Sequence, residues 1–381
     1  MNKEYILMKL SEFKFKLPEN QIAQFPPLHR EDAKMLVLHR NTGKVEHKSI
    51  VELVEYFDEQ DLMVFNDTKV FPARLYGIKE KTNAEIEIFL LRELNHNESC
   101  WDAIVEPARK IRIGNKLYLD DDNTIIAEVV DNTTSRGRTL RFVSDYSPDK
   151  LVEQLYAMGT TPLPEYIRRP MKAEASRNFR KEFMIEDDAE LESIVREMDE
   201  ERYQSIFAKN VGAVAAPASS IHISKNLLKR IEIRGINYTT LTSHVSLGNF
   251  KIIDVEDLNK HKVDSEQIIV EQPCVEAVNK AKQGKKRICA VGTEVFRALE
   301  SVAGTNGLIK EYEGWTNRFI YPPYDTLVPC ALLVNFYFPL SIQLMMVAAF
   351  GGYEQVMVAY KEALKKGYRF GDYGDAMLIV D

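Results

Sequence analysis

Six short, strand-like segments between about Val70 and Asp145 interrupt the chain and constrain its fold more than any other feature. Each spans four to eleven residues and ends at turn residues, with no long helical pattern between them: ARLYGIKE, AEIEIFLLREL, WDAIVEP, KLYLD, TIIAEVVD and TLRFVS. Strands joined by local turns favour a small barrel or sandwich. On both sides of this run strands alternate with helices, which is typical of an α/β domain. We therefore predict a discontinuous three-layer α/β domain, residues 1–70 and 151–381, with a small all-β domain of residues 71–150 inserted into it.

Length, charge and cysteine spacing exclude several classes of protein. The 381 residues exceed one ordinary core, and the formal charge of −7 (50 basic against 57 acidic side chains) excludes a general polycation while leaving room for a local basic patch. The four cysteines lie far apart without a Cys/His cluster, so neither a metal site nor a disulfide framework is indicated. The N-terminal segment lacks an export signal, and the longest apolar stretches are too short to cross a bilayer. We expect a soluble, cytoplasmic protein without membrane contact.

Two loops rich in small residues, each with one histidine, bracket a single helical run between Val211 and Phe250. The first, VGAVAAPASSIHIS, contains His222, and its lack of bulk lets the backbone approach a ligand closely. The second carries His244 after a β-prone run and ends at Gly248, so His244 is expected near a strand end, where ligands bind in α/β sheets. Either histidine alone could equally be a structural imidazole. The repeated arrangement favours a site.

Two further polar loops follow strand-like runs. Asn66-Asp67-Thr68-Lys69 comes directly after the apolar run DLMVF, where sites are commonly assembled, although an ordinary Asn-Asp turn has the same composition. Val291-Gly292-Thr293 precedes a helix whose first N–H groups could receive an anion or the polar edge of a nucleotide. Because this loop lacks a GxGxxG or P-loop pattern, its signal is weak by itself.

Basic side chains are grouped in and beside the all-β segment. One group is RKIR at residues 109–112 and another is TSRGR at residues 134–138, where cations beside Ser, Thr and Gly suit phosphate contacts. In the proline-stiffened segment TPLPEYIRRP, Tyr166 among arginines could stack on a base. Each group could equally be a solvated hairpin tip or, for Tyr166, a packing contact.

The segment 171–201 is very highly charged, with few apolar residues at helical spacing. It includes FRKEF and IEDDAELESIVREMDEER. We interpret it as a surface helix or helical hairpin within the α/β domain that carries no chemistry.

Nine segments, taken in order, resemble those of one protein family: VFNDTKVFPARL, NTTSRGR, TPLPEYI, RYQSIFA, GAVAAP with His222, LTSHVSLGNF, AVGTEVFRALES, FIYPPY and YRFGDYGDAMLI. Over nearly its whole length the chain is similar to the S-adenosylmethionine:tRNA ribosyltransferase-isomerases of queuosine biosynthesis. The resemblance implies a monomeric enzyme in which a β-barrel domain is set into an α/β domain.

The same resemblance implies a specific reaction. Such enzymes transfer the ribosyl part of S-adenosylmethionine to 7-aminomethyl-7-deazaguanine at the tRNA wobble position. They isomerise it, giving epoxyqueuosine and releasing adenine and methionine. We therefore expect tRNA and S-adenosylmethionine as partners, the latter as a co-substrate, with no cofactor and no metal.

This reaction requires a base that removes a proton next to the sulfonium, a donor that helps adenine leave, and close positioning of both substrates. Our candidates for the catalytic groups are His222 and His244 for proton handling, with Asp67 and Glu266 to orient them or to bind ribose hydroxyls. Arginines suit phosphate or the methionyl carboxylate, and small polar groups suit the nucleoside. The candidate substrate-binding residues are Asn66, Thr68, Lys69, Arg74, Arg136, Arg138, Tyr166, Gly292, Thr293, Arg297, Asn335, Tyr337, Arg369 and Asp375.

The chain departs from the family pattern in its loops, at Ser219, Ser220, Ser246, Glu294 and Tyr337. Side chains in place of glycines would narrow a pocket, Glu294 replaces a threonine, and Tyr337 replaces an imidazole. Two hypotheses follow: an active enzyme with a locally varied pocket, or a paralogue that binds tRNA or nucleoside but has lost or altered the transfer step. A methyltransferase is poorly supported, because no glycine-rich loop follows an early strand.

Overall fold

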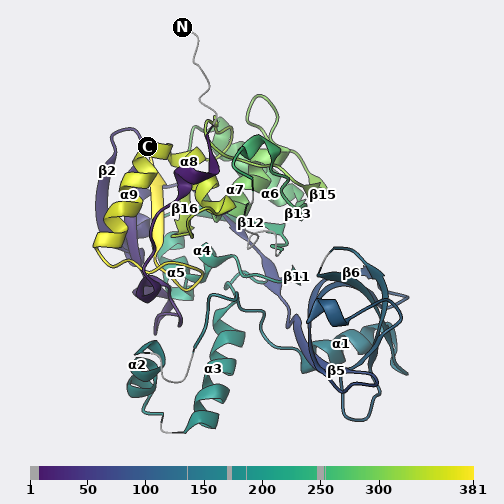
Figure 1. Cartoon of the computed structure of the whole chain (residues 1–381). Coiled ribbons are helices and arrows are strands. Elements are labelled where there is room, and N and C mark those ends of the chain that lie inside the picture. The colour runs from purple at the N-terminus through teal and green to yellow at the C-terminus, as the bar shows by residue number, and fades with distance from the viewer. Residues whose placement is uncertain (1–7, 135, 170–173, 186, 247–252, 254) are drawn as a thin grey trace.

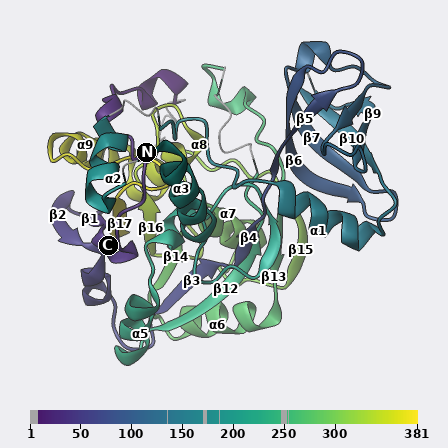
Figure 2. The same cartoon turned by 90° about the horizontal axis from the view of Figure 1, so that it is seen from below.

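The computed structural model describes residues 8–134, 136–169, 174–185, 187–246, 253 and 255–381, and it confirms the predicted fold class. A mixed α/β body carries a separate closed β-barrel at one side (Figure 1; Figure 2). The end of the second predicted loop, residues 247–250 with Gly248, lies outside the described residues.

The body is built on a nine-stranded mixed sheet. Its strand order is β15 (Tyr312–Thr316), β13 (Glu266–Val270), β12 (Asn237–Ser243), β3 (Leu62–Asn66), β14 (Ile288–Val291), β16 (Ala331–Asn335), β17 (Ala376–Val380), β1 (Lys34–His39) and β2 (Lys44–Ser49). The central strands β12, β3, β14 and β16 are parallel neighbours, and the strands that flank this group, β13 and β17, run antiparallel to it. The four central strands therefore end at one edge of the sheet.

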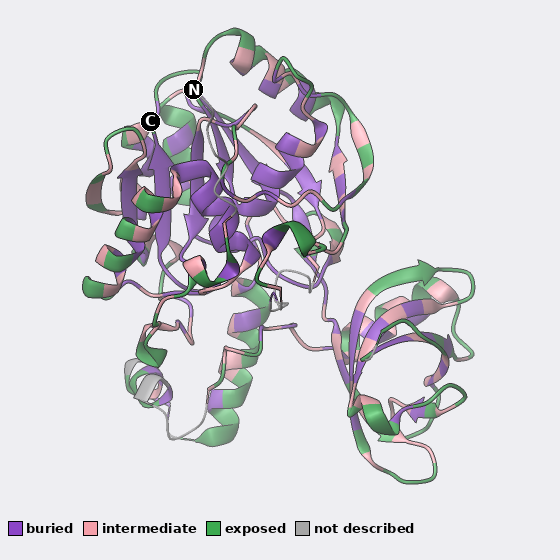
Figure 3. Ribbon diagram, turned by 45° about the horizontal axis from the view of Figure 1, so that its top comes forward, coloured by how far each residue is buried: buried purple, intermediate pink, exposed green. Residues whose placement is uncertain are grey.

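Successive residues of the central strands alternate between two apolar cores, one on each face of the sheet. Strands β3, β14 and β16 are buried along their whole length (Figure 3). In β3, Leu62 and Val64 enter one core, and Met63 and Phe65 enter the other. The first core is covered by α6 (Gln272–Gln283), α7 (Thr293–Val302), α8 (Ile342–Gly351) and α9 (Tyr353–Lys365). The second is covered by α5 (Lys225–Ile233) and the 3-10 helix η4 (Ile50–Tyr56). This is the three-layer arrangement that the alternation of strands and helices predicts.

The barrel closes through six strands in the order β10 (Gly137–Val143), β7 (Cys100–Glu106), β6 (Glu85–Asn95), β5 (Arg74–Lys79), β8 (Lys116–Tyr118) and β9 (Ile126–Asn132). In β10, Leu140 and Phe142 are buried, whereas Arg141 and Val143 are exposed, as the two-residue period of a strand requires. Helix α1 (Pro148–Met158) packs Leu151 against the same core. The barrel is therefore a packed body with its own core.

Two chain segments join the barrel to the body, and they pair with each other. Thr160 N donates to the carbonyl oxygen of Arg74 at 2.9 Å, and Arg74 N donates to that of Thr160 at 3.3 Å. The segments approach so closely that a Cβ added to Gly159 would lie 2.1 Å from the carbonyl oxygen of Pro72. Just before this neck, β4 (Thr68–Val70) pairs in parallel with β11 (Asn210–Ala213). The start of the barrel is thus fixed relative to the sheet.

A helical hairpin occupies the charged segment, formed by α2 (Glu174–Phe183) and α3 (Asp188–Arg202) (Figure 1). Phe179 stacks on Phe25 with ring centroids 4.3 Å apart and shares a small core with Leu191. Within the described ranges, no single helix is long and apolar enough to cross a membrane. Helices α8 and α9 satisfy that test only together, as a pair bent by 117°.

Replacing Gly159 by alanine is expected to destabilise the protein by about 1–3 kcal/mol, the usual result of overpacking. The φ of −71° and ψ of 161° at Gly159 suit alanine, so the loss would come from the contact with Pro72. Gly304→Ala is the matched control, because the atom nearest to its added Cβ is the side-chain oxygen of Asn306, 3.2 Å away. Urea denaturation compares the two variants, and equal midpoints would contradict a steric role for the neck.

Candidate functional site

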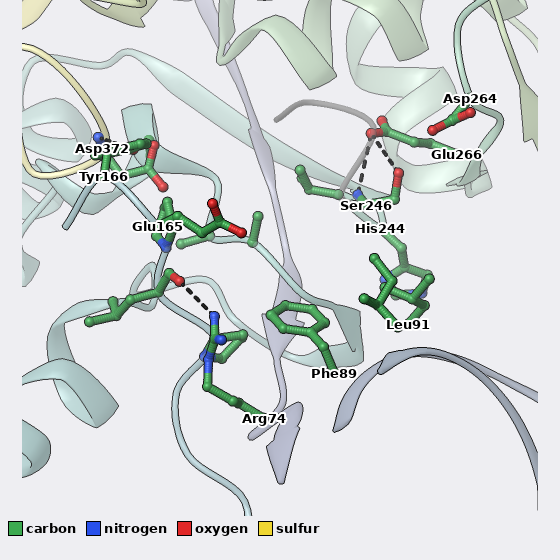
Figure 4. A pocket seen from close by; sticks show the side chains of 18 of the residues that line it. Arg74, Phe89, Leu91, Glu165, Tyr166, His244, Ser246, Asp264, Glu266 and Asp372 are labelled. Atoms are coloured by element: carbon green, nitrogen blue, oxygen red, sulfur yellow. Dashed lines mark hydrogen bonds between the residues drawn. The ribbon is translucent and has the colours of Figure 1, made fainter. Parts of the chain in front are cut away.

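Polar loops gather at the edge where the four parallel strands end. They contribute Thr68 after β3, His244 after β12, Glu294 after β14 and Tyr337 after β16. An open cleft of about 3060 Å³ is lined by residues of this edge and of the barrel (Figure 4). Ligands of α/β sheets bind outside the carboxyl ends of the strands, so this cleft is the candidate site.

The cleft separates the predicted site residues into two groups. The first lines it: Arg74, Arg136, Tyr166, His244, Glu266, Thr293 and Tyr337. The second lies outside the lining that the described residues form: Asn66, Asp67, Thr68, Lys69, Arg138, His222, Gly292, Arg297, Asn335, Arg369 and Asp375. Several of the second group support members of the first.

His244 is held in the cleft by hydrogen bonds that begin at Asn66. The Asn66 Oδ1 atom accepts from the backbone N–H groups of Thr68 at 3.1 Å and Ser243 at 3.0 Å, and its Nδ2 donates to the Ser243 carbonyl at 2.9 Å. Thr68 Oγ1 and His244 Nδ1 then form a hydrogen bond of 2.8 Å. Asn66 and Thr68 are fully buried, so they position the imidazole.

The surroundings of His244 keep it neutral. Burial lowers the pKa of His244, and the charge of Asp67 only partly opposes this effect. Gly212 lies against the ring, where an added Cβ would be 2.6 Å from Cε1. The carboxylate of Asp67 accepts hydrogen bonds from Asn210, Thr240 and Thr242. Asp67 therefore braces the strand ends, and His244 is a neutral imidazole able to accept a proton.

His222 is buried within the body, after the short helix α4 (Ala218–Ile221), and is only 1% exposed. Its Nε2 hydrogen-bonds to Oδ1 of Asn335 at 2.9 Å, and the Asn335 amide group donates to the carbonyls of Gly371 and Asp372. This orientation makes His222 Nε2 the donor. Burial lowers the pKa of His222 to about 4. These contacts give His222 a structural role in place of the proton handling that we expected.

Glu266 belongs to a buried ion pair at the cleft wall. Its Oε2 pairs with the guanidinium of Arg297, which is 1% exposed and whose pKa burial lowers to about 10. Its Oε1 accepts from the N–H of Ser246 at 3.3 Å and faces the Ser246 hydroxyl at 3.5 Å (Figure 4). Arg297 therefore neutralises Glu266 instead of binding a phosphate or carboxylate, and Glu266 is suited to accept hydrogen bonds.

Glu294, Tyr337 and Thr293 form a second part of the wall. The hydroxyls of Thr293 and Tyr337 lie 3.5 Å apart. Glu294 is 7% exposed, and burial raises its pKa to about 7. Of the five departures from the family pattern, Ser246, Glu294 and Tyr337 line the cleft, while Ser219 and Ser220 are buried outside the described lining. The departures thus alter the composition of the wall directly.

Among the arginines that the barrel contributes to the cleft are Arg74 and Arg136, which the sequence predicts. Arg74 pairs with Glu87, donates to the carbonyl of Leu163 at 3.1 Å, and lies over the ring of Phe89 at 5.0 Å (Figure 4). Arg136 is exposed and pairs with Glu106. Both cations are held by surface-accessible carboxylates, from which a polyanion could detach them.

Arg138, which we expected to contact phosphate, does not line the cleft. It is 6% exposed, and its guanidinium donates to the backbone carbonyls of Ile111, Ala108 and Gly137. The two-residue period of β10 places Arg138 on the inward face together with Leu140. Arg138 therefore braces the end of the barrel.

Four other predicted residues lie outside the described lining of the cleft. Asp375 accepts from the N–H groups of Lys34 at 3.0 Å and Arg369 at 2.8 Å, and pairs with the Arg369 guanidinium at 3.6 Å. Gly292 directly precedes α7 with a φ of +108°, a conformation that favours glycine. Lys69 is exposed on β4. Arg369 and Asp375 thus bond to each other at the turn before β17.

Several residues on the cleft were not predicted from the sequence, and among them are Asp372, Glu165, Arg92 and Trp315. Asp372 and Glu165 fall inside segments already matched to the family, YRFGDYGDAMLI and TPLPEYI, but neighbouring residues were chosen there. Arg92 of the barrel lies over the ring of Trp315 of β15 at 5.1 Å. That contact joins segments over 200 residues apart, and no local sequence pattern predicts it.

Comparisons with known proteins agree over the whole chain. The family model described as queuosine biosynthesis protein matches residues 10–379. The chain is 58% identical to S-adenosylmethionine:tRNA ribosyltransferase-isomerase of Bacteroides fragilis and 52% identical to that of Cytophaga hutchinsonii, covering 98% of this chain and 100% of each relative. A crystal structure of S-adenosylmethionine tRNA ribosyltransferase from Thermotoga maritima, 29% identical, matches with a TM-score of 0.52 over 97% of this chain and 100% of that one.

The buried imidazole of His222 should make the free energy of unfolding decrease as the pH is lowered. An unfolded histidine titrates near 6.5, whereas folded His222 stays neutral down to about 4. Its contribution is therefore full above pH 6.5 and is lost between these values, by about 3 kcal/mol in total. Replacing His222 by glutamine should flatten this dependence, measured as the free energy of urea unfolding between about pH 7 and 4. Parallel curves for both proteins would contradict the assignment.

Proposed function

This chain belongs to the S-adenosylmethionine:tRNA ribosyltransferase-isomerase family of queuosine biosynthesis, and we propose that the cleft between the sheet edge and the barrel carries out its reaction. The enzyme transfers the ribosyl part of S-adenosylmethionine to the aminomethyl-deazaguanine of tRNA and isomerises it, releasing adenine and methionine. The observation that carries the placement is that polar side chains after the ends of β12, β14 and β16, Glu266 at the start of β13, and cations of the barrel line one cleft. Its volume, about 3060 Å³, exceeds the ~300–1,000 Å³ of ordinary small-molecule pockets, as two substrates would require.

We assign proton removal next to the sulfonium to His244. Among the described residues that line the cleft, it is the one histidine, and its neutral imidazole can act as a base at neutral pH. If Nδ1–H donates to Thr68, the lone pair of Nε2 is free to accept the proton from carbon. Thr68 is then a positioning residue that selects this tautomer. Glu266 and Thr293 are suited to hydrogen-bond ribose hydroxyls or the adenine edge.

We assign tRNA binding to the barrel side of the cleft. Arg74 and Arg136 can pair with phosphates, and the exposed ring of Trp315 can stack on an unpaired base. The body and the barrel of a single chain supply both walls, which supports a monomer as the active unit. We further propose that S-adenosylmethionine is consumed as a co-substrate, without a resident cofactor or metal, and that the enzyme acts in the cytoplasm.

A single-turnover assay tests the function and the base together. Purified protein, S-adenosylmethionine and tRNA bearing the aminomethyl-deazaguanine should yield adenine and the mass of epoxyqueuosine. His244→Ala should slow adenine release by about 10²–10⁴-fold, the usual contribution of a general base. Thr68→Val should slow it less and change its pH profile, whereas His222→Gln should stay close to the parent rate. If the parent protein binds tRNA but releases no adenine, the chain is a binding paralogue.

Two arginines separated by one residue should behave differently towards tRNA. Arg136→Ala is expected to weaken binding and to reduce the slope of log affinity against log salt by about 0.7–0.9, the value of one phosphate contact. Arg138→Lys should leave that slope unchanged but lower thermal stability, since it removes carbonyl contacts inside the barrel. Filter binding at several salt concentrations measures the slope. A changed slope for Arg138→Lys would overturn its structural assignment.

A further inference from the structure

One carboxyl group on the cleft wall has an atom that its surroundings do not satisfy. Glu294 is the second residue of α7, is 7% exposed, and lines the cleft. In the part of the chain that the structure describes, its Oε1 atom has no hydrogen-bond partner. A buried polar atom left without a partner costs about 1–3 kcal/mol, so its presence calls for an explanation.

The backbone provides a cradle for this carboxyl group. A Cβ added to Gly292 would lie 2.2 Å from Oε1 of Glu294 and 2.6 Å from its Oε2. Glycine therefore leaves the space into which the carboxyl folds, and its φ of +108° suits that residue alone. The carboxyl group of Glu294 therefore lies against the backbone of the strand-to-helix turn.

A second buried carboxyl lies within electrostatic reach. Asp372 is 8% exposed, lines the same cleft, and accepts a hydrogen bond from the Tyr203 hydroxyl at 2.7 Å. Burial and, less strongly, the charge of Asp372 raise the pKa of Glu294 to about 7, against the opposing effect of hydrogen bonding to its own backbone and to the Asn66 side chain. Burial also raises the pKa of Asp372. Among the described residues no ion pair joins a basic side chain to either carboxyl. Two buried carboxyl groups without a cationic partner destabilise the folded protein when they are ionised.

We propose that Glu294 and Asp372 form a subsite for a positively charged group of the substrates, an ammonium or a sulfonium. The inference rests on the proposed function, which supplies such groups from two sources. S-adenosylmethionine carries a sulfonium and an α-ammonium, and the target base carries a primary ammonium on its aminomethyl group. A bound cation would give Oε1 of Glu294 its missing partner and would relieve the repulsion between the two carboxyls.

Equilibrium binding to Glu294→Gln tests the subsite without relying on turnover. The variant keeps the shape and loses the charge, so affinity for the cation that occupies the subsite should fall about tenfold or more, as for other hydrogen bonds to charged groups. The ligands are S-adenosylmethionine, S-adenosylhomocysteine, which lacks the sulfonium methyl group and with it the positive charge, tRNA with the aminomethyl base, and the same tRNA with guanine.

Each outcome has one meaning. Weaker binding of S-adenosylmethionine alone identifies the sulfonium, and equal weakening of both nucleosides identifies the α-ammonium. A lost preference for aminomethyl tRNA over guanine tRNA identifies the primary ammonium. Unchanged affinity for all four ligands overturns the proposal. Failure of the proposed function is seen separately, as absence of adenine release from the parent protein.

Controls separate charge at the subsite from general effects. Glu93→Gln removes a carboxylate from the barrel side of the same cleft and should leave the ligand preferences unchanged. Glu294→Thr, which restores the family residue, should reproduce the Glu294→Gln result, and Asp372→Asn should shift the same preference while keeping an acceptor for Tyr203. Calorimetry in buffers of different ionisation enthalpy adds a signature that a structural role would not give. Cation binding near pH 7 should release part of a proton from the parent protein and less from Glu294→Gln.

Discussion

The arrangement of the site depends on the side-chain amide of Asn66. This fully buried group bonds both to the N–H and to the carbonyl of Ser243, and so ties the end of β3 to the end of β12. The same oxygen accepts from the N–H of Thr68, whose hydroxyl then meets the imidazole of His244. An aspartate at this position could not donate to the carbonyl, and a leucine would leave three backbone groups without a partner. The Asn66 amide thereby positions the imidazole of His244 relative to the strand ends.

The cleft wall is built at the expense of local stability. Glu266 and Arg297 are both removed from water and paired with each other, an arrangement that an apolar pair of similar volume would often match or exceed in stability. Glu294 is buried against Gly292 with a carboxyl oxygen unpaired. Such groups persist because the two apolar cores on either side of the sheet hold the strand ends in place. The wall is thus prepared for ligands before they arrive.

How far the sequence predicts this molecule depends on the range of the interactions. The six barrel strands are joined by local turns, so their pattern could be recognised without knowing what they pack against. The sheet order could not, because β3 pairs with β12 and β14, both far away along the chain. Within the site, the polar loop after β3 was recognisable, but the sequence treats His222 and His244 alike. Only their burial and partners separate a structural imidazole from one that faces the cleft.

Arg138 shows a different kind of error, since the information was present locally. Its place two residues before Leu140 and four before Phe142 puts it on the inward face of β10, and the alternation along the strand announces this. The turn before β10 is basic in composition, but the alternation along the strand decides which way Arg138 faces. Where a basic motif runs directly into a strand, the two-residue alternation of side chains is therefore the better guide to whether an arginine faces the core or the solvent.

The paired neck of the barrel has a consequence for how this fold could have arisen. The segment that enters the barrel and the segment that leaves it lie side by side at Arg74 and Thr160. The two ends of the inserted domain are therefore adjacent in space. A gene fragment encoding it could enter a loop of an older α/β protein, or leave it, without breaking any strand of the large sheet. Recombination at a single surface loop could thus have turned a sheet edge open to solvent into a two-walled cleft.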